Sequence, residues 1–286
     1  MLLIENTLFG ELNKEEIAIE RCKEFQNKNP EKKAILAFSG GKDSIVLYHI
    51  MKRSGIDFTP IYSPPSVDAP ELKYFMDKYY PEVFRQPYHK DENGREITMW
   101  TLIPKKLLPP TRRMRYCCEE LKERTGEAGD TVFTGVRWAE SAKRSKMPMV
   151  GFWKEKIMIR PLIDWSDEDI WEYIRKYNIP YCELYDQGFK RIGCIGCPLN
   201  SKNQKLELER YPKIKAAYIR AFDRMIKNRI DAGKVCNWKN GQEVMDWWLG
   251  ECRKKEIDGQ NSLFIDEFDE CISEEYSENE SGCPMF

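Results

Sequence analysis

The stretch Ala37-Phe38-Ser39-Gly40-Gly41-Lys42-Asp43-Ser44 decides the fold of this chain. An apolar run, residues 34–38, precedes the two glycines, and an amphipathic run, residues 45–51, follows them. This order predicts a buried strand, a tight turn and the start of a helix. Glycines let backbone N–H groups close on an anion, and the helix N-terminus is partially positive at the same place. The stretch therefore predicts a phosphate cradle, although the G-x-x-x-x-G-K-[ST] spacing is absent.

The same stretch resembles a known loop. A glycine turn by itself can be a purely structural turn that binds no ligand. Residues 39–44, however, resemble the pyrophosphate loop (PP-loop) of the adenine-nucleotide α-hydrolase-like superfamily, which includes adenylyl-sulfate and phosphoadenylyl-sulfate reductases, sulfurylase subunits and tRNA thiolation enzymes. The resemblance implies an adenine nucleotide, with Mg²⁺ if that nucleotide is ATP. The predicted nucleotide-binding residues are Phe38, Ser39, Gly40, Gly41, Lys42, Asp43, Ser44, Ser63, Gly135 and Arg137.

Composition narrows the class of protein. The 286 residues are 41% hydrophobic and carry a net charge of −1, which fits one large domain or a domain with an appendage. No apolar stretch reaches membrane-spanning length, and the N-terminus lacks a secretory pattern, so we expect a cytoplasmic protein without a membrane partner. Ten cysteines in a reducing compartment are expected to be thiols or metal ligands rather than disulfides.

The order of predicted elements indicates an α/β fold with a doubly wound, mostly parallel sheet. Strands are expected at 34–38, 58–62, 83–86, 131–134 and 157–162. Helices are expected at 12–26, 45–53, 68–79 with Asp68 as cap, 166–180 behind a capping box, and over most of 97–124, broken by Pro104 and Pro109-Pro110. The predicted domains are 1–200, a helical Trp-rich extension at 201–258, and an acidic, disordered tail at 259–286.

Two pairs of cysteines are further candidates for a functional site. Residues 111–122 place three arginines beside Cys117-Cys118, and this positive setting favours thiolates. The alternative is a solvated basic helix face. Cys194 and Cys197 form a C-x-x-C knuckle bounded by glycines, which suits a redox pair, half a zinc site or half an iron–sulfur site. Arginines here and past the strand at 131–134 can hold a sulfate or phosphate. The predicted anion-binding residues are Arg112, Arg113, Arg115 and Arg144, besides Arg137.

Both pairs lie within a longer pattern. Residues 117–122 and 194–197, with Thr134-Gly135-Val136-Arg137 and residues 140–144 between them, resemble the split cluster motif of iron–sulfur adenylyl-sulfate reductases. The resemblance covers roughly residues 30–200 and implies that Cys117, Cys118, Cys194 and Cys197 hold one [4Fe–4S] cluster, with Lys122 offsetting their negative charge. Zinc bound by the same four thiolates is the alternative.

The sequence departs from that family at its C-terminal side. The reductases carry a nucleophilic cysteine in a Glu-Cys-Gly-x-His segment, which attacks the sulfur of adenylyl sulfate, whereas Glu251-Cys252-Arg253-Lys254 lacks the glycine and histidine. The candidate catalytic residues are Cys252 and Cys283. The first hypothesis is reduction of adenylyl sulfate or its 3′-phosphorylated form, with a thioredoxin-like reductant as partner.

Two further hypotheses remain open. In the second, ATP activates a tRNA or DNA acceptor for sulfur insertion. In the third, the chain is a nucleotide-binding partner in a sulfur-transfer complex, docking through its acidic tail and tryptophans. The tryptophans of residues 238–252 are expected to pack into a core, with nucleic-acid stacking as the alternative. The sequence leaves a homo-oligomer open.

Overall fold

A sheet built around the strand before the PP-loop organises the molecule. In this computed structural model, residues 3–7, 10–26, 32 and 34–251 are described. The strands are β1 (Ile4–Thr7), β2 (Gly10–Asn13), β3 (Ala34–Ala37), β4 (Phe58–Tyr62), β5 (Phe84–Arg85), β6 (Thr131–Phe133), β7 (Val150–Trp153) and β8 (Lys156–Ile159). The α-helices are α1 (Lys14–Glu24), α2 (Lys42–Ser54), α3 (Pro70–Tyr79), α4 (Met99–Lys106), α5 (Asp167–Lys176), α6 (Gln204–Arg210), α7 (Pro212–Asp231) and α8 (Gly241–Trp248). A π-helical turn, η1, spans Cys118–Lys122.

The larger sheet of the described chain has the strand order β5-β4-β3-β6-β8-β7. All neighbours pair in parallel except β7, which runs antiparallel to β8. The predicted α/β class with a mostly parallel sheet is confirmed. The chain leaves the central strand β3 toward β4 on one side and later returns to β6 on the other, so the order reverses between β3 and β6. Ligands of such sheets bind beyond the carboxyl ends of the strands at this switch point, where the PP-loop lies.

Side chains alternate across the sheet and give its faces different cores. Leu36, Phe133 and Ile159 belong to the main core, which also holds apolar residues of α1, α2, α3 and α5. The opposite face carries a smaller cluster formed by Ile35, Ala37, Val132 and Met158. The main core therefore fixes α2, and with it the PP-loop, against the end of β3.

Two local predictions were wrong. Asp68 does not cap α3, because Ala69 is the N-cap residue and the Asp68 carboxylate accepts a hydrogen bond from Tyr62 instead. Pro104 does not break the helix but lies inside α4. A proline there leaves the carbonyl of Trp100 without its helical donor, and Arg224 of α7 supplies one at 3.0 Å. A neighbouring helix thus makes the proline tolerable.

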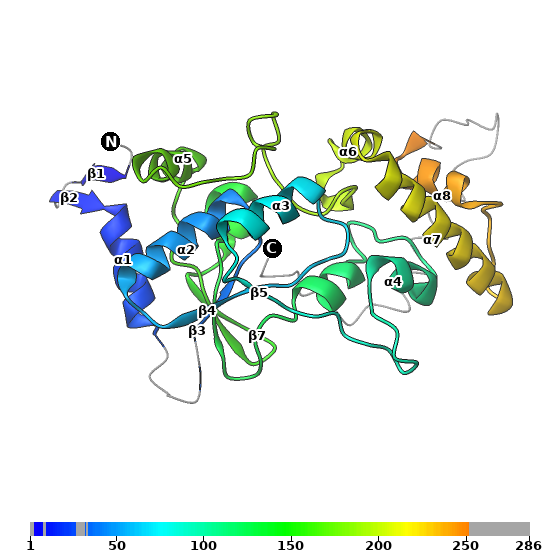
Figure 1. The fold of residues 1–286 in the computed structure, drawn as a ribbon, viewed down its shortest axis with the longest axis horizontal. Coiled ribbons are helices and arrows are strands. Elements are labelled where there is room, and N and C mark those ends of the chain that lie inside the picture. Colours follow the sequence, from blue (N-terminus) through cyan, green and yellow to red (C-terminus); the bar gives the residue numbers. More distant parts are fainter. Residues whose placement is uncertain (1–2, 8–9, 27–31, 33, 252–286) are drawn as a thin grey trace.

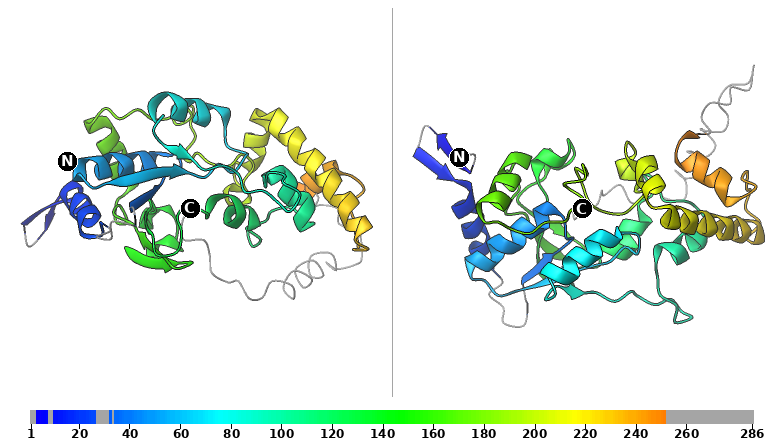
Figure 2. Two further views of the ribbon diagram at one scale, coloured as in Figure 1. Left: turned by 60° about the horizontal axis from the view of Figure 1, so that its bottom comes forward. Right: turned by 45° about the horizontal axis from the view of Figure 1, so that its top comes forward.

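The helices α4, α6, α7 and α8 lie together at one end of the molecule (Figures 1 and 2). The expected helical C-terminal region is present in α6, α7 and α8. Trp248 is buried, packs against Tyr218 and Phe222, and donates its indole N–H to the carbonyl of Pro110 at 2.6 Å. Trp248 therefore fills core and leaves no ring face for a nucleic-acid base.

No helix among the described residues combines the length and the apolar character needed to cross a membrane.

Candidate functional site

The PP-loop, residues 39–44, leads from β3 into α2 in a conformation that depends on its glycines. Gly40 has φ +73°, and a Cβ there would lie 2.7 Å from Leu72 Cδ1 and 2.9 Å from Met76 Sδ. The hydroxyl of Ser44 accepts from the N–H of Ser39 at 3.2 Å and donates to the carbonyl of Gly41 at 2.9 Å. The loop is thus closed on itself, and α2 starts at Lys42 without a side-chain cap. The predicted strand, glycine turn and helix start are confirmed.

Four charged side chains alternate beside the loop. Lys42 Nζ lies 2.9 Å from Asp167 Oδ1 and 3.2 Å from Asp43 Oδ1. Arg137 Nε lies 2.7 Å from Asp43 Oδ1, and Arg137 Nη2 lies 2.6 Å from Asp167 Oδ1. Burial alone would raise the pKa of Asp167, but hydrogen bonds from Lys42 and Arg137 outweigh it and lower that pKa. Asp167 is therefore ionised, and together with Asp43 it holds the two cations in place.

These ion pairs differ from the role predicted for Arg137, which is to contact a nucleotide. Its side chain is 1% exposed, and its Nη1 donates to the carbonyl of Trp165 at 3.0 Å. The guanidinium thus holds carboxylates and a backbone oxygen in this structure, and its contact with a nucleotide stays a prediction. Gly135, two residues earlier, packs so closely that a Cβ would lie 3.0 Å from the backbone of Asp43. The segment after β6 therefore packs directly against the first turn of α2.

The two predicted cysteine pairs line one cavity. Its walls are Pro65, Met99, Pro110, Cys117, Cys118, Lys122, Cys194, Cys197, Pro198 and Tyr218, and we call this the cysteine cavity. Cys194 is brought there by the loop after β4, because it forms a β-bridge with Asp68 and the N–H of Ile195 donates to the carbonyl of Val67 at 2.8 Å. The four sulfurs are free thiols. Cys117 and Cys194 are 77 positions apart in the sequence, so two distant segments together present a set of ligands that are all thiols.

The electrostatics of the cysteine cavity favour a thiolate at Cys118, whereas the raised pKa values of Cys117 and Cys194 favour neutral thiols there. Cys117 donates to Cys118, and Arg115 Nη2 lies 3.6 Å from Cys118 Sγ. The Cys117 hydrogen bond and the charges of Arg115 and Lys122 lower the pKa of Cys118 to about 5, although its burial opposes them. Burial raises the pKa of Cys194. Burial would lower the pKa of Lys122, but Cys194, Asp68 and Cys118 raise it, so Lys122 is a cation beside the sulfurs.

A single metal ion is not a ready fit for these groups. Among the described residues, no three His, Cys, Asp or Glu side chains converge closely enough to hold one ion. Four thiols around a shared apolar cavity are a donor set that an iron–sulfur cluster takes, and binding of such a cluster by these residues stays a prediction.

The predicted anion-binding arginines do not gather at one point. Arg112 and Arg113 are exposed, whereas Arg115 points to Cys118. Arg144 forms an ion pair with Glu140 on the segment after β6. Arg115 donates a hydrogen bond to a cysteine sulfur. The anion-binding role of these four arginines stays a prediction.

Ser63 ends β4 on the ligand side of the sheet, as expected. It is buried, and its hydroxyl donates to Gln86 Oε1 and meets Thr125 Oγ1, both at 2.8 Å. Its predicted contact with a nucleotide would have to replace one of these bonds.

Two residues at the PP-loop escaped prediction. Asp167 is expected only as a first-turn residue of α5, whose capping box between Ser166 and Asp169 is confirmed. Tyr185 accepts a hydrogen bond from the N–H of Lys42 at 2.9 Å, across 143 residues. No local pattern encodes either contact, because both depend on the return of the chain to the loop after β8.

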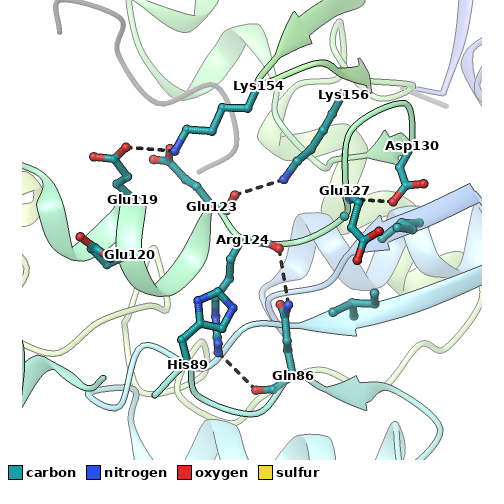
Figure 3. Close-up of a pocket in the computed structure, with 13 residues that line it drawn as sticks. Gln86, His89, Glu119, Glu120, Glu123, Arg124, Glu127, Asp130, Lys154 and Lys156 are labelled. Atoms are coloured by element: carbon teal, nitrogen blue, oxygen red, sulfur yellow. Dashed lines mark hydrogen bonds and ion pairs between the residues drawn. The ribbon is translucent and has the colours of Figure 1, made fainter. Parts of the chain in front are cut away.

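A second, larger cavity of about 660 Å³ lies on the opposite face of the sheet (Figure 3). Its floor includes Ile35 and Ile61, and its walls are charged. These walls are largely paired internally: Lys154 meets Glu119 at 2.9 Å, and Lys156 donates to the carbonyl of Thr125 at 2.9 Å. None of the predicted site residues lines this cavity, so its size does not make it the functional site.

Comparison with known proteins places the chain. The family model described as phosphoadenosine phosphosulfate reductase domain matches residues 33–200. The chain belongs to this family. The phosphoadenosine 5′-phosphosulfate reductase of Xylella fastidiosa is 30% identical over 172 residues, covering 56% of this chain and 70% of that protein. An uncharacterized protein of Methanocaldococcus jannaschii is 30% identical over 196 residues, covering 64% of this chain but only 40% of its own length.

Among solved structures, a phosphoadenylyl-sulfate reductase from Candida auris, a phosphate complex, is similar. It shares 19% identity with a TM-score of 0.42, over 62% of this chain and 87% of that one. The part that matches the phosphoadenosine phosphosulfate reductase family contains the PP-loop and both cysteine pairs. The candidate catalytic residues Cys252 and Cys283, and the acidic tail, lie outside the described residues.

Proposed function

We propose that this member of the phosphoadenosine phosphosulfate reductase family binds an adenine nucleotide in its PP-loop and reduces or transfers sulfur beside a [4Fe–4S] cluster. One observation carries the proposal: the anion-binding loop and the cysteine cavity are joined by one short segment, residues 181–197. Tyr185 of that segment touches the PP-loop, and Cys194 and Cys197 end it in the cavity.

In this proposal the PP-loop binds the phosphoryl groups. The N–H groups at the start of α2 and the hydroxyls of Ser39 and Ser44 donate to phosphoryl oxygens, and Lys42 adds a full charge. Asp43 and Asp167 keep Lys42 and Arg137 oriented until the nucleotide arrives. With ATP, Mg²⁺ would need oxygen ligands, and these two carboxylates are the nearest of that type to the loop.

The cysteine cavity supplies the second part. Cys117, Cys118, Cys194 and Cys197 would hold the cluster, which supplies a redox-active inorganic centre next to the nucleotide. Lys122 and Arg115 balance the charge of the thiolates. A cytoplasmic location suits this chemistry, because free thiolates persist in a reducing compartment.

Nucleotide binding is tested by isothermal titration with ATP, adenylyl sulfate and phosphoadenylyl sulfate. We expect Lys42→Ala to weaken binding by about 10- to 100-fold, because a charge-assisted hydrogen bond is lost, and to leave the metal content unchanged. The control is Lys52→Ala at the other end of α2, where the lysine is exposed. Equal affinities of the wild type and Lys42→Ala would refute the cradle.

The reaction itself is tested under anaerobic conditions. Sulfite released from adenylyl sulfate or phosphoadenylyl sulfate with thioredoxin, and abolished by Cys252→Ser or Cys283→Ser, would support reduction. Pyrophosphate released from ATP, and increased by tRNA or DNA, would support sulfur insertion instead. Tight partner binding without either product would support a non-catalytic subunit.

A further inference from the structure

The first N–H of α2 already has a partner in this structure. Tyr185 Oη accepts from the N–H of Lys42 at 2.9 Å. A Cβ on Gly41 would lie 3.5 Å from this phenol oxygen and 3.5 Å from Ser39 Oγ, so the oxygen lies over the side-chain-free part of the loop. Tyr185 thus places an oxygen where the N-terminus of a helix attracts the oxygen of an anion.

The phenol is held there by its surroundings. Its ring packs edge-on against Trp171, with centroids 5.2 Å apart, and lies 6.3 Å from the ring of Tyr181. The chain turns tightly around it, because the N–H of Tyr185 donates to the carbonyl of Cys182 and the N–H of Gly188 to that of Tyr185, both at 3.1 Å. Burial raises the pKa of Tyr185, so its hydroxyl stays neutral.

A neutral oxygen is a weaker acceptor than a phosphoryl oxygen at the same N–H. Hydrogen bonds to an ionised acceptor are roughly twice as strong as neutral ones, and the positive end of α2 adds to the preference for an anion. A nucleotide that reaches the loop can therefore replace the phenol, while water or a weak anion gains little by doing so.

We propose that Tyr185 is a displaceable cap of the PP-loop, which occupies the phosphoryl position until a nucleotide's phosphoryl group expels it. This proposal rests on the nucleotide-binding function proposed above. The expelled phenol belongs to the segment 181–193, which leads directly to Cys194. The cap thus lies on the segment that joins the PP-loop to the cysteine cavity.

The test compares the affinity of three chains for ATP and for inorganic pyrophosphate by isothermal titration. Tyr185→Phe keeps the ring but removes the competing oxygen, so we expect it to bind both ligands roughly three- to tenfold more tightly than the wild type. Tyr181→Phe is the matched control, because its hydroxyl bonds Asp186 in the same aromatic cluster and does not touch the loop. Its affinity should equal that of the wild type.

A second readout follows the movement of the phenol. Trp171 emission, taken as the difference between the wild type and Trp171→Phe, should change when ATP binds. Equal or weaker binding by Tyr185→Phe, or unchanged Trp171 emission in a chain that binds ATP, overturns the cap and leaves the nucleotide function standing. If neither the wild type nor Tyr185→Phe binds either ligand, the cap and the proposed function both fail.

Discussion

The geometry of the PP-loop depends on a residue whose side chain is only a hydrogen atom. Gly40 combines a left-handed backbone with two side chains of α3 so near that they exclude a methyl group. The loop and α3 can therefore approach only because residue 40 has no side chain.

Gly40→Ala should lower the free energy of unfolding by about 2–4 kcal/mol, since it adds left-handed strain to overpacking against Leu72 and Met76. Gly55→Ala is the matched control: Gly55 has φ +75°, but a Cβ there meets nothing within 4 Å. It should cost only about 1 kcal/mol, the conformational part. Urea unfolding measures both, and equal losses would contradict the steric argument.

At this scale the sequence predicts the loop and its lysine but not their partners. Residues 39–44 are contiguous, so their pattern carries their geometry. Asp167 and Tyr185 reach the loop from far along the chain, since they lie 125 and 143 residues after Lys42. A tyrosine in a polar turn has no local feature that distinguishes it from a surface residue.

Among the elements, α1, α2 and α5 are tied together by a buried carboxylate. Glu15 of α1 is 4% exposed and pairs with Arg53 of α2 and with Lys176 of α5. Burial alone would raise its pKa, but hydrogen bonds from Tyr177, Lys176 and Arg53 lower it below 4.5. One side chain thus fixes the helix that carries the PP-loop relative to both neighbours.

Glu15→Gln should lower the free energy of unfolding at pH 7 by about 2–4 kcal/mol, because the paired cations lose a buried partner. The folded-state pKa lies below the unfolded value, so the carboxylate stabilises above about pH 4.5 and this contribution is lost as the pH falls further. The wild type should therefore lose stability below pH 4.5 more steeply than Glu15→Gln. Glu16→Gln, on the exposed side of α1, should behave like the wild type. Parallel pH profiles would contradict this reasoning.

Element prediction succeeded where the signal was local and failed where a neighbour supplied a partner. The Ser166 capping box needs only residues 166–169, and it formed. Pro104 is a helix breaker by its own chemistry, but Arg224 of α7 replaces the missing donor, so the helix continues. The antiparallel edge strand β7 was also missed, because its short run, residues 150–153, has no marked alternation.

For the molecule as a whole, the cysteine cavity lies where the sheet and the C-terminal helices meet. Its walls include Met99 of α4, both ends of η1, the 194–198 knuckle and Tyr218 of α7. The sequence alone brought the two cysteine pairs together by resemblance. It did not reveal Tyr218 or Met99, because apolar wall residues look like any other core residue.

Protein purified anaerobically should be brown with about four irons per chain, and Cys194→Ser should lose both the iron and the visible absorption. Cys236→Ser is the control, because Cys236 lies outside the cavity and its thiol bonds the carbonyl of Trp238 at 3.6 Å. Iron analysis and absorption spectra measure the outcome. Stoichiometric zinc without visible absorption, or full iron in Cys194→Ser, would rule out the cluster.

The residues that line the cysteine cavity come from distant parts of the chain, and this limits when the site can be completed during synthesis. A nascent polypeptide that has not been synthesised as far as residue 218 lacks Tyr218, and one that ends before residue 194 lacks half of the sulfurs. If the proposed cluster is held by all four thiols, it could be inserted only after the ribosome has made at least 197 residues, so its delivery would be a late step of biogenesis.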